Sequence, residues 1–199
     1  MQISVILAHP YDESFNHAIA KTVVDTLKEN NHTVYFHDLY KENFDPVMTA
    51  KELVSDQSED KQVVEHYEEI KSVDGIIIIH PNWWGQPPAI LKGWVDRVFR
   101  QGIVYDFAKN EKGEGYLVKL IKAQTGLVFN TSNTPEKIEN EVFGDPLENL
   151  WKACVFGFCD IRTFERKMFR VVVSSTEQER KEWLNEAACL TSKYFPKNK

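Results

Sequence analysis

The chain has 199 residues and a formal net charge of −6. Its hydrophobic fraction of 42% is ordinary for a globular protein, and the length suits one large domain. The acidic balance and the scattered Lys and Arg residues argue against non-specific nucleic-acid binding. No apolar stretch is long enough for insertion into a membrane. The three cysteines form no CxxC pair, which favours reduced thiols and a cytoplasmic location.

Apolar runs that are typical of strands alternate along the chain with spaced apolar residues that are typical of amphipathic helices. Residues 3–8 form the first apolar run, and apolar residues at 15, 19, 23 and 27 then predict a helix over 15–29. The remaining elements are expected in this order: a strand at 33–37, an irregular polar segment at 39–58, a helix at 59–72, a buried strand at 74–79, a helix from about residue 90, a Gly-rich loop at 101–116, a strand at 123–130, a polar loop at 131–141, a helix at 145–158, a strand within 163–173 and a helix at 176–195.

Five strands separated by helices predict an α/β fold with a doubly wound five-stranded parallel sheet. Right-handed crossovers place helices on both faces, and the order 2-1-3-4-5 is favoured. The chain shows no repeat, linker or second core, so we expect a single domain over residues 1–199. In this strand order, a ligand crevice is expected beyond the carboxyl ends of the first and third strands.

A short polar loop follows the first strand and leads into the helix at 15–29. His9, Ser14 and Asn16 lie in or next to this loop, where the unpaired N–H groups of a helix start suit a phosphate. An ordinary N-cap at Ser14 and a loop histidine explain the same residues equally well. Because there is neither a GxGxxG nor a GxxxxGK[ST] motif, a Rossmann fold or a P-loop kinase has no support.

Two adjacent tryptophans, Trp83 and Trp84, follow the buried strand at 74–79 in a proline-rich turn. Indole rings at the end of a buried strand predict a flat aromatic cofactor or substrate. Residues 130–135 follow the next strand and would close the other side of the crevice, with polar groups for a heteroaromatic edge. Taken alone, that segment is more typical of an ordinary Asn/Ser/Thr turn than of a ligand contact.

These motifs together resemble the flavodoxin-like NAD(P)H:quinone oxidoreductases of the DT-diaphorase and modulator-of-drug-activity-B type. The similarity rests on His9-Pro10 with residues 14–16, on residues 81–84, and on the run Pro-Ala-Ile-Leu-Lys-Gly-Trp at 88–94. It extends in order along nearly the whole chain, and it implies a flavodoxin-like fold.

The resemblance also implies which residues bind a flavin. They fall into three groups: His9, Ser14, Phe15 and Asn16 at the phosphates and adenine side; Pro81, Asn82, Trp83 and Trp84 along the isoalloxazine ring; and Asn130, Thr131, Ser132 and Asn133 at the polar edge of the ring.

The activity that the resemblance implies is two-electron, ping-pong hydride transfer from NADPH or NADH through the flavin to a quinone or a similar acceptor. FAD is the expected cofactor, with FMN as the alternative, and the family forms homodimers. The chain departs from the family at residues 136–145, where Phe143 replaces a relay histidine and no tyrosine is present. We therefore assign no catalytic side chain.

Three other functions fit parts of the sequence. A flavin-binding regulatory subunit of an ion-efflux system would share the fold and the cofactor. A metal hydrolase would use His9 and His80, but no HxH or HxxxH spacing is present and His80 precedes a proline, so we predict no metal. A one-electron flavodoxin carrier is disfavoured because such carriers are shorter and more acidic.

Overall fold

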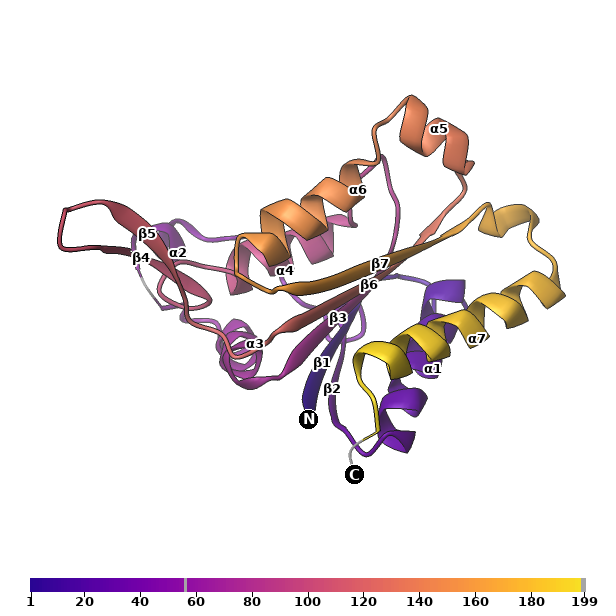
Figure 1. The fold of residues 1–199 in the computed structure, drawn as a ribbon, viewed down its shortest axis with the longest axis horizontal. Coiled ribbons are helices and arrows are strands. Elements are labelled where there is room, and N and C mark those ends of the chain that lie inside the picture. Colours follow the sequence, from indigo (N-terminus) through magenta and orange to yellow (C-terminus); the bar gives the residue numbers. More distant parts are fainter. Residues whose placement is uncertain (56, 198–199) are drawn as a thin grey trace.

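The computed structural model of the chain describes residues 1–55 and 57–197. Five parallel strands form the central sheet in the order β2-β1-β3-β6-β7 (Figure 1), which confirms the predicted 2-1-3-4-5 order. The strands of this sheet are β1 (Gln2–Leu7), β2 (Thr33–Asp38), β3 (Gly75–Pro81), β6 (Thr125–Ser132) and β7 (Thr163–Arg170).

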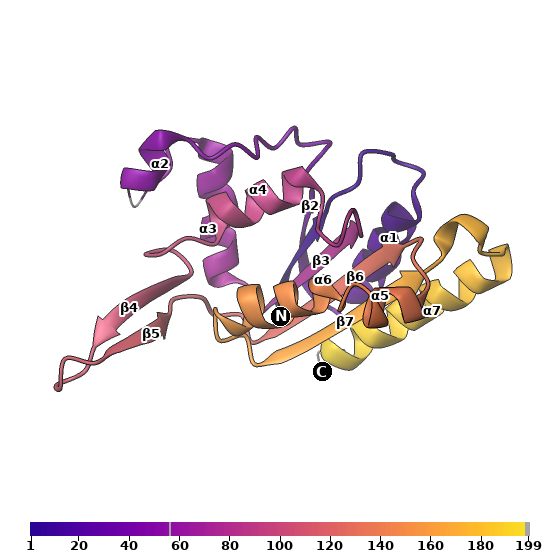
Figure 2. The same cartoon turned by 90° about the horizontal axis from the view of Figure 1, so that it is seen from above.

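Helices cover both faces of the sheet, as Figure 2 shows from above. One face carries α1 (Phe15–Glu29) and α7 (Glu177–Tyr194), which lie side by side. The other carries α3 (Lys61–Ser72), α4 (Ala89–Val98) and α6 (Pro146–Asn149), and α6 continues into a π-helical segment, Leu150–Gly157.

Strand β3 shows why both faces are covered. Ile77 and Ile79 pack in the core under α1 and α7, whereas Ile76 and Ile78 pack in the core on the opposite face. All four side chains are fully buried. A strand that is buried on both sides carries a continuous apolar run, which is why this segment was recognisable from the sequence.

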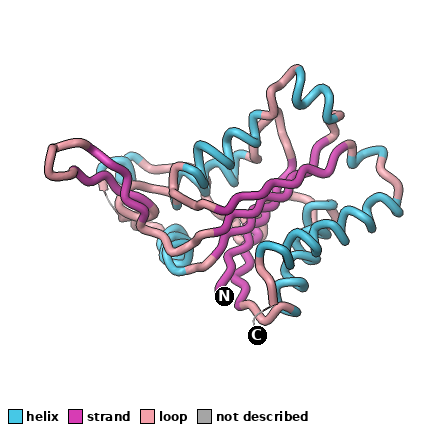
Figure 3. Tube along the Cα trace, viewed as in Figure 1, coloured by secondary structure: helices cyan, strands magenta, loops and turns pink. Residues whose placement is uncertain are grey.

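The segment predicted as a Gly-rich loop at 101–116 is instead largely a β-hairpin. Its antiparallel strands, β4 (Tyr105–Lys109) and β5 (Gly115–Lys119), form a separate two-stranded sheet. Figure 3 shows this hairpin extending away from the main sheet. Tyr105 and Phe107 alternate with charged residues, a period-two pattern that the glycines and charges of the segment obscured.

Two short helices lie in segments that were expected to be irregular. α2 (Ala50–Val54) starts at a capping box between Thr49 and Glu52, and α5 (Glu136–Glu141) follows Pro135. Such helices span fewer than two turns, so they show no measurable periodicity in a sequence. Strand β6 also runs two residues beyond its predicted end, to Ser132.

Among the helices of the described residues, none combines the length and apolar character that a membrane crossing requires.

Candidate functional site

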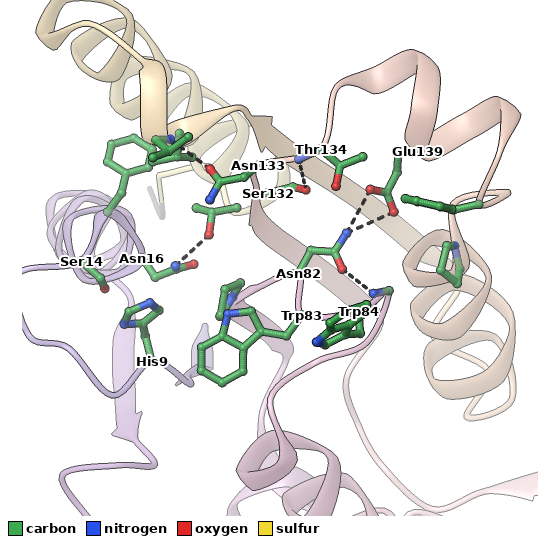
Figure 4. Close-up of a pocket in the computed structure, with 18 of the residues that line it drawn as sticks. His9, Ser14, Asn16, Asn82, Trp83, Trp84, Ser132, Asn133, Thr134 and Glu139 are labelled. Carbon is green, nitrogen blue, oxygen red and sulfur yellow. Dashed lines mark hydrogen bonds between the residues drawn. The ribbon is translucent and has the colours of Figure 1, made fainter.

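A cavity of about 1080 Å³ lies beyond the carboxyl ends of β1, β3 and β6, where the strand order predicts a ligand crevice (Figure 4). This volume is slightly above the range for small-molecule sites, which is roughly 300–1,000 Å³. Every flavin-binding residue predicted from the sequence lines the cavity except Asn130. Further lining residues are not among the predicted flavin-binding residues: Tyr11, Gly85, Thr134, Glu139, Phe143, Pro146, Val172 and Val173.

The loop after β1 supplies hydrogen-bond donors to one end of the cavity. Ser14 caps α1, and its hydroxyl oxygen accepts the backbone N–H of His17 at 3.3 Å. The Nδ1 atom of His9 lies 3.1 Å from the backbone nitrogen of Tyr11 and 3.3 Å from the carbonyl oxygen of the same residue, and the tautomer decides which of the two it bonds. Burial lowers the pKa of His9 and favours the neutral ring. The histidine, the hydroxyl and the start of α1 together suit an anionic ligand.

Asn16 presents a buried polar atom for which the described residues supply no partner. Its side chain is only 2% exposed, and its Nδ2 donates to Thr131 Oγ1 at 2.9 Å. The Oδ1 atom accepts no hydrogen bond from the described part of the chain. Buried acceptors are nearly always satisfied, so Asn16 Oδ1 is an exception at the wall of the cavity.

The two tryptophans lie on a two-residue turn after β3. Trp83 and Gln86 exchange backbone hydrogen bonds at 3.0 and 3.1 Å, with Trp84 (φ 58°) and Gly85 (φ 71°) between them. These angles define a type I′ turn, in which the first central position favours Asn or Gly. Trp84 is fully exposed in spite of its size, and Trp83 tilts over the ring of His9. A strained, exposed indole at a cavity wall points to ligand contact.

Helix α5 reaches this turn through the side chain of Glu139. Asn82 Nδ2 donates to both carboxylate oxygens of Glu139 at 3.1 Å, and Asn82 Oδ1 accepts the Gly85 N–H at 2.9 Å (Figure 4). Glu139 is 1% exposed although its helix is polar. A helix start after Pro135 is the sequence signal that could have revealed Glu139, because one position of such a short helix faces the interior.

The end of β6 forms the third wall. Thr131 contacts Asn16, as described above, and Ser132 Oγ accepts the backbone N–H of Thr134 at 3.0 Å. Asn133 Oδ1 accepts the backbone N–H of Val173 at 2.9 Å, which ties this wall to the turn after β7.

Asn130 does not line the cavity, contrary to the prediction. It is fully buried, and its Nδ2 donates to His80 Nε2 at 2.8 Å while its Oδ1 accepts from Arg166 at 3.3 Å. The physical reason is that β6 continues to Ser132. Successive side chains of a strand point to opposite faces, so Asn130 turns toward the face of α6, whereas Thr131 turns toward α1.

His80 is engaged on both ring nitrogens. Its Nδ1–H donates to the Pro81 carbonyl at 2.8 Å, and its Nε2 accepts from Asn130 and from Trp151 Nε1 at 2.9 Å. Burial lowers its pKa to about 3, so the ring is neutral. His80 does not line the cavity and has no free lone pair. It is therefore not available as the second histidine ligand that the metal-hydrolase hypothesis requires.

Two groups of potential metal ligands lie elsewhere among the described residues: Asp12, His17 and Asp38, and His37, Glu42 and His66. In the second group, both His37 nitrogens face carboxylates, of Glu42 at 3.0 Å and Glu69 at 2.9 Å. Trp94 Nε1 donates to His66 Nδ1 at 2.8 Å, so a neutral His66 carries its proton on Nε2, the atom that faces Glu42. This nitrogen then offers no lone pair to a metal.

A sequence profile described as flavodoxin-like fold matches residues 1–189. The chain therefore belongs to the flavodoxin-like fold family. It is 31% identical to an uncharacterized NAD(P)H oxidoreductase of Haemophilus influenzae, with 92% of this chain and 91% of that protein aligned. It is 27% identical to ribosyldihydronicotinamide dehydrogenase (quinone) of Mus musculus, over 90% and 86% of the two chains.

The fold is also similar to that of a solved structure. The crystal structure of Smu.1420 from Streptococcus mutans UA159 superposes with a TM-score of 0.83 at 30% identity, covering 97% of this chain and 100% of that chain.

Proposed function

We propose that the chain is a flavin-dependent NAD(P)H:quinone oxidoreductase that transfers two electrons from the nicotinamide to a quinone or a similar flat acceptor. The observation that carries the proposal is one cavity that joins an anion-binding end at His9 and Ser14 to an exposed indole at Trp84. The names of the Haemophilus and mouse relatives are consistent with this chemistry.

The cavity walls fit the parts of a flavin. The start of α1, with His9 and Ser14, would hold phosphate oxygens. Asn16 lines the cavity next to this end and would lie beside the sugar or ribityl part of the ligand. The turn at Trp84 would lie along the flat ring, and the polar atoms of residues 131–133 would reach its edge. We favour FAD over FMN on the similarity at residues 14–16.

The protein's part in the reaction is positional. A bound flavin supplies the hydride chemistry. Trp84 and the backbone of its turn would orient flat reactants, and donor and acceptor would use this cavity in turn, as a ping-pong cycle requires. Donors at the end of β6 would stabilise negative charge at the edge of the ring.

We also propose that the protein works as a homodimer in the cytoplasm. The projecting hairpin and the segment beside it expose aromatic side chains: Phe107 at 57%, Tyr116 at 51% and Phe158 at 40%. Apolar surface of this kind is typical of an interface between protein chains. All three cysteines are free thiols. No contact among the described residues favours the regulatory-subunit alternative.

Steady-state kinetics test the proposed function. Protein reconstituted with FAD or FMN is assayed with NADH, NADPH and ribosyldihydronicotinamide as donors and with menadione as acceptor. The expected result is flavin-dependent oxidation of at least one donor, with parallel-line ping-pong kinetics. The proposal fails if no donor is oxidised by fully reconstituted protein. Sedimentation analysis of the same sample tests the dimer.

A further inference from the structure

The two ends of the cavity differ in the charge that they favour. Figure 4 shows His9 and Ser14 at one end and Glu139 at the other, on the side of Trp84. Among the described residues that line the cavity there is no Lys or Arg, and Glu139 is the one acidic residue. A flat ligand along the tryptophan turn (residues 83–86) would therefore lie near a carboxylate, with no basic side chain in the same wall.

The carboxylate of Glu139 is held by an uncharged group. The amide nitrogen of Asn82 lies 3.1 Å from each of its two oxygens, so both oxygens accept, as those of an ionised carboxylate do. The described residues give this carboxylate no other side-chain partner. Because Glu139 is only 1% exposed, solvent screens its charge much less than a charge on the surface. Its negative potential therefore reaches into the cavity.

Two arginines on β7 are engaged with other carboxylates. Arg166 forms ion pairs with Asp145 and, at 2.8 Å, with Glu148. Arg170 lies 3.8 Å from the carboxylate of Asp145. Neither arginine lines the cavity. The wall at the tryptophan turn consequently keeps the negative charge of Glu139.

A buried negative charge discriminates between ligands by their own charge. An anionic ring beside a carboxylate is repelled, and the repulsion is stronger in a protein wall than in water. A neutral ring escapes this penalty, and a cationic ring is attracted. Selectivity of this kind comes from a repulsive element that acts against the wrong ligand.

We propose that Glu139 determines the class of electron acceptor: the cavity takes neutral or cationic flat acceptors and rejects anionic ones. The inference rests on the proposed function, because it takes the acceptor to bind along the tryptophan turn. Glu139 acts here through its charge, in addition to holding the Asn82 amide.

Isothermal titration calorimetry with oxidised, flavin-loaded protein tests this selectivity, and without a donor no electrons are transferred. The matched ligands are 2-methoxy-1,4-naphthoquinone, which is neutral, and 2-hydroxy-1,4-naphthoquinone, which is an anion at neutral pH. We expect the neutral quinone to bind about tenfold more tightly than the anion. A naphthoquinone with a quaternary ammonium substituent should bind at least as tightly as the neutral one. Equal affinities for the anion and the neutral quinone would overturn the inference.

A charge-removing variant separates the charge of Glu139 from its structural role. Glu139→Gln keeps an oxygen for the Asn82 amide and removes the charge, so the two matched quinones should bind with similar affinity. A purely structural role would weaken both ligands alike and leave the wild-type ratio unchanged, which would overturn the inference. Glu141→Gln is the matched control, because the Glu141 side chain is 65% exposed, and it should keep the wild-type ratio.

The remaining outcomes also decide the question. Should Glu139→Gln fail to fold, the wild-type order of affinity for the cationic, neutral and anionic naphthoquinones suffices, because an anion that binds as well as the other two overturns the inference. Protein that reduces menadione but binds ligands without regard to charge refutes this inference alone. Protein that takes up no flavin or reduces no quinone refutes the proposed function, and the inference with it.

Discussion

Asn82 and Glu139, which lie 57 residues apart in the chain, are joined by hydrogen bonds of 3.1 Å from one amide nitrogen to both carboxylate oxygens. This pairing leaves Asn82 Oδ1 free to accept the N–H of Gly85, so one carboxylate on α5 fixes the orientation of the amide that braces the tryptophan turn. The indole wall of the cavity therefore depends on a helix that reaches it through the side chain of Glu139.

Removing that carboxylate should loosen the turn. Glu139→Ala leaves the Asn82 amide without its acceptor, which we expect to destabilise the fold by about 1–3 kcal/mol and to weaken flavin binding. Urea unfolding and flavin titration measure the two effects. Glu141→Ala on the same helix is the control, because the Glu141 side chain is 65% exposed. If both variants behave alike, the pairing has no role in holding the turn.

Trp84 is expected to lower the stability of the fold and to strengthen ligand binding. The left-handed conformation is strained for a tryptophan, whereas Trp84→Asn would give the asparagine–glycine pair that a type I′ turn prefers. Because the indole is fully exposed, little buried area is lost. The variant should be more stable by about 1 kcal/mol and should bind flavin and menadione more weakly. An unchanged affinity would show that the indole does not contact ligands.

Glycine is required at position 85 by the left-handed backbone conformation and by the close approach of a neighbouring side chain. The φ of Gly85 is +71°, and a Cβ placed on it would lie 2.7 Å from Pro146 Cγ. Gly113 has a φ of +81° with no atom within 4 Å of such a Cβ. We expect Gly113→Ala to destabilise the fold by about 1 kcal/mol, from backbone strain alone, and Gly85→Ala to be worse and to reduce flavin affinity. Equal losses of stability in the two variants would contradict the steric part of this account.

His37 should make stability depend on pH. Burial alone would lower its pKa, but hydrogen bonds to Glu42 and Glu69 outweigh burial and raise the pKa to about 9, from an ordinary value of 6.5. The folded state therefore binds the proton more tightly than the unfolded state. The resulting stability, about 3 kcal/mol, is complete below pH 6.5 and is lost as the pH rises through 9.

Unfolding free energies of wild type and His37→Gln, measured from pH 6 to pH 10, check this expectation. The wild-type curve should fall relative to that of the variant between pH 6.5 and 9. Parallel curves over that interval would mean that His37 does not gain its proton from the two carboxylates.

The fold was predictable where side chains repeat with a clear period. The isoleucines of β3 and the apolar stripe of α1 report burial directly, so the five strands and their order followed from the sequence. The hairpin at β4 and β5 was missed because charged residues alternate there with aromatic ones, and because it extends away from the main sheet.

The site was predictable in its position and only partly in its details. Polar residues at the end of β6 looked like a loop, so the alternation that turns Asn130 inward was not applied. The contact of Glu139 with Asn82 depends on tertiary structure, since nothing near either residue in the chain indicates the other. The link from Ser14 to His17 is local, and a serine three residues before a histidine at a helix start could have indicated it.

The most direct test of the central claim is to identify and count the flavin. Purified protein, or protein incubated with FAD and FMN and then desalted, is denatured, and the released flavin is identified by chromatography and compared with the protein concentration. The account predicts about one flavin per chain, released as FAD. Protein that stays colourless and retains neither FAD nor FMN would contradict it.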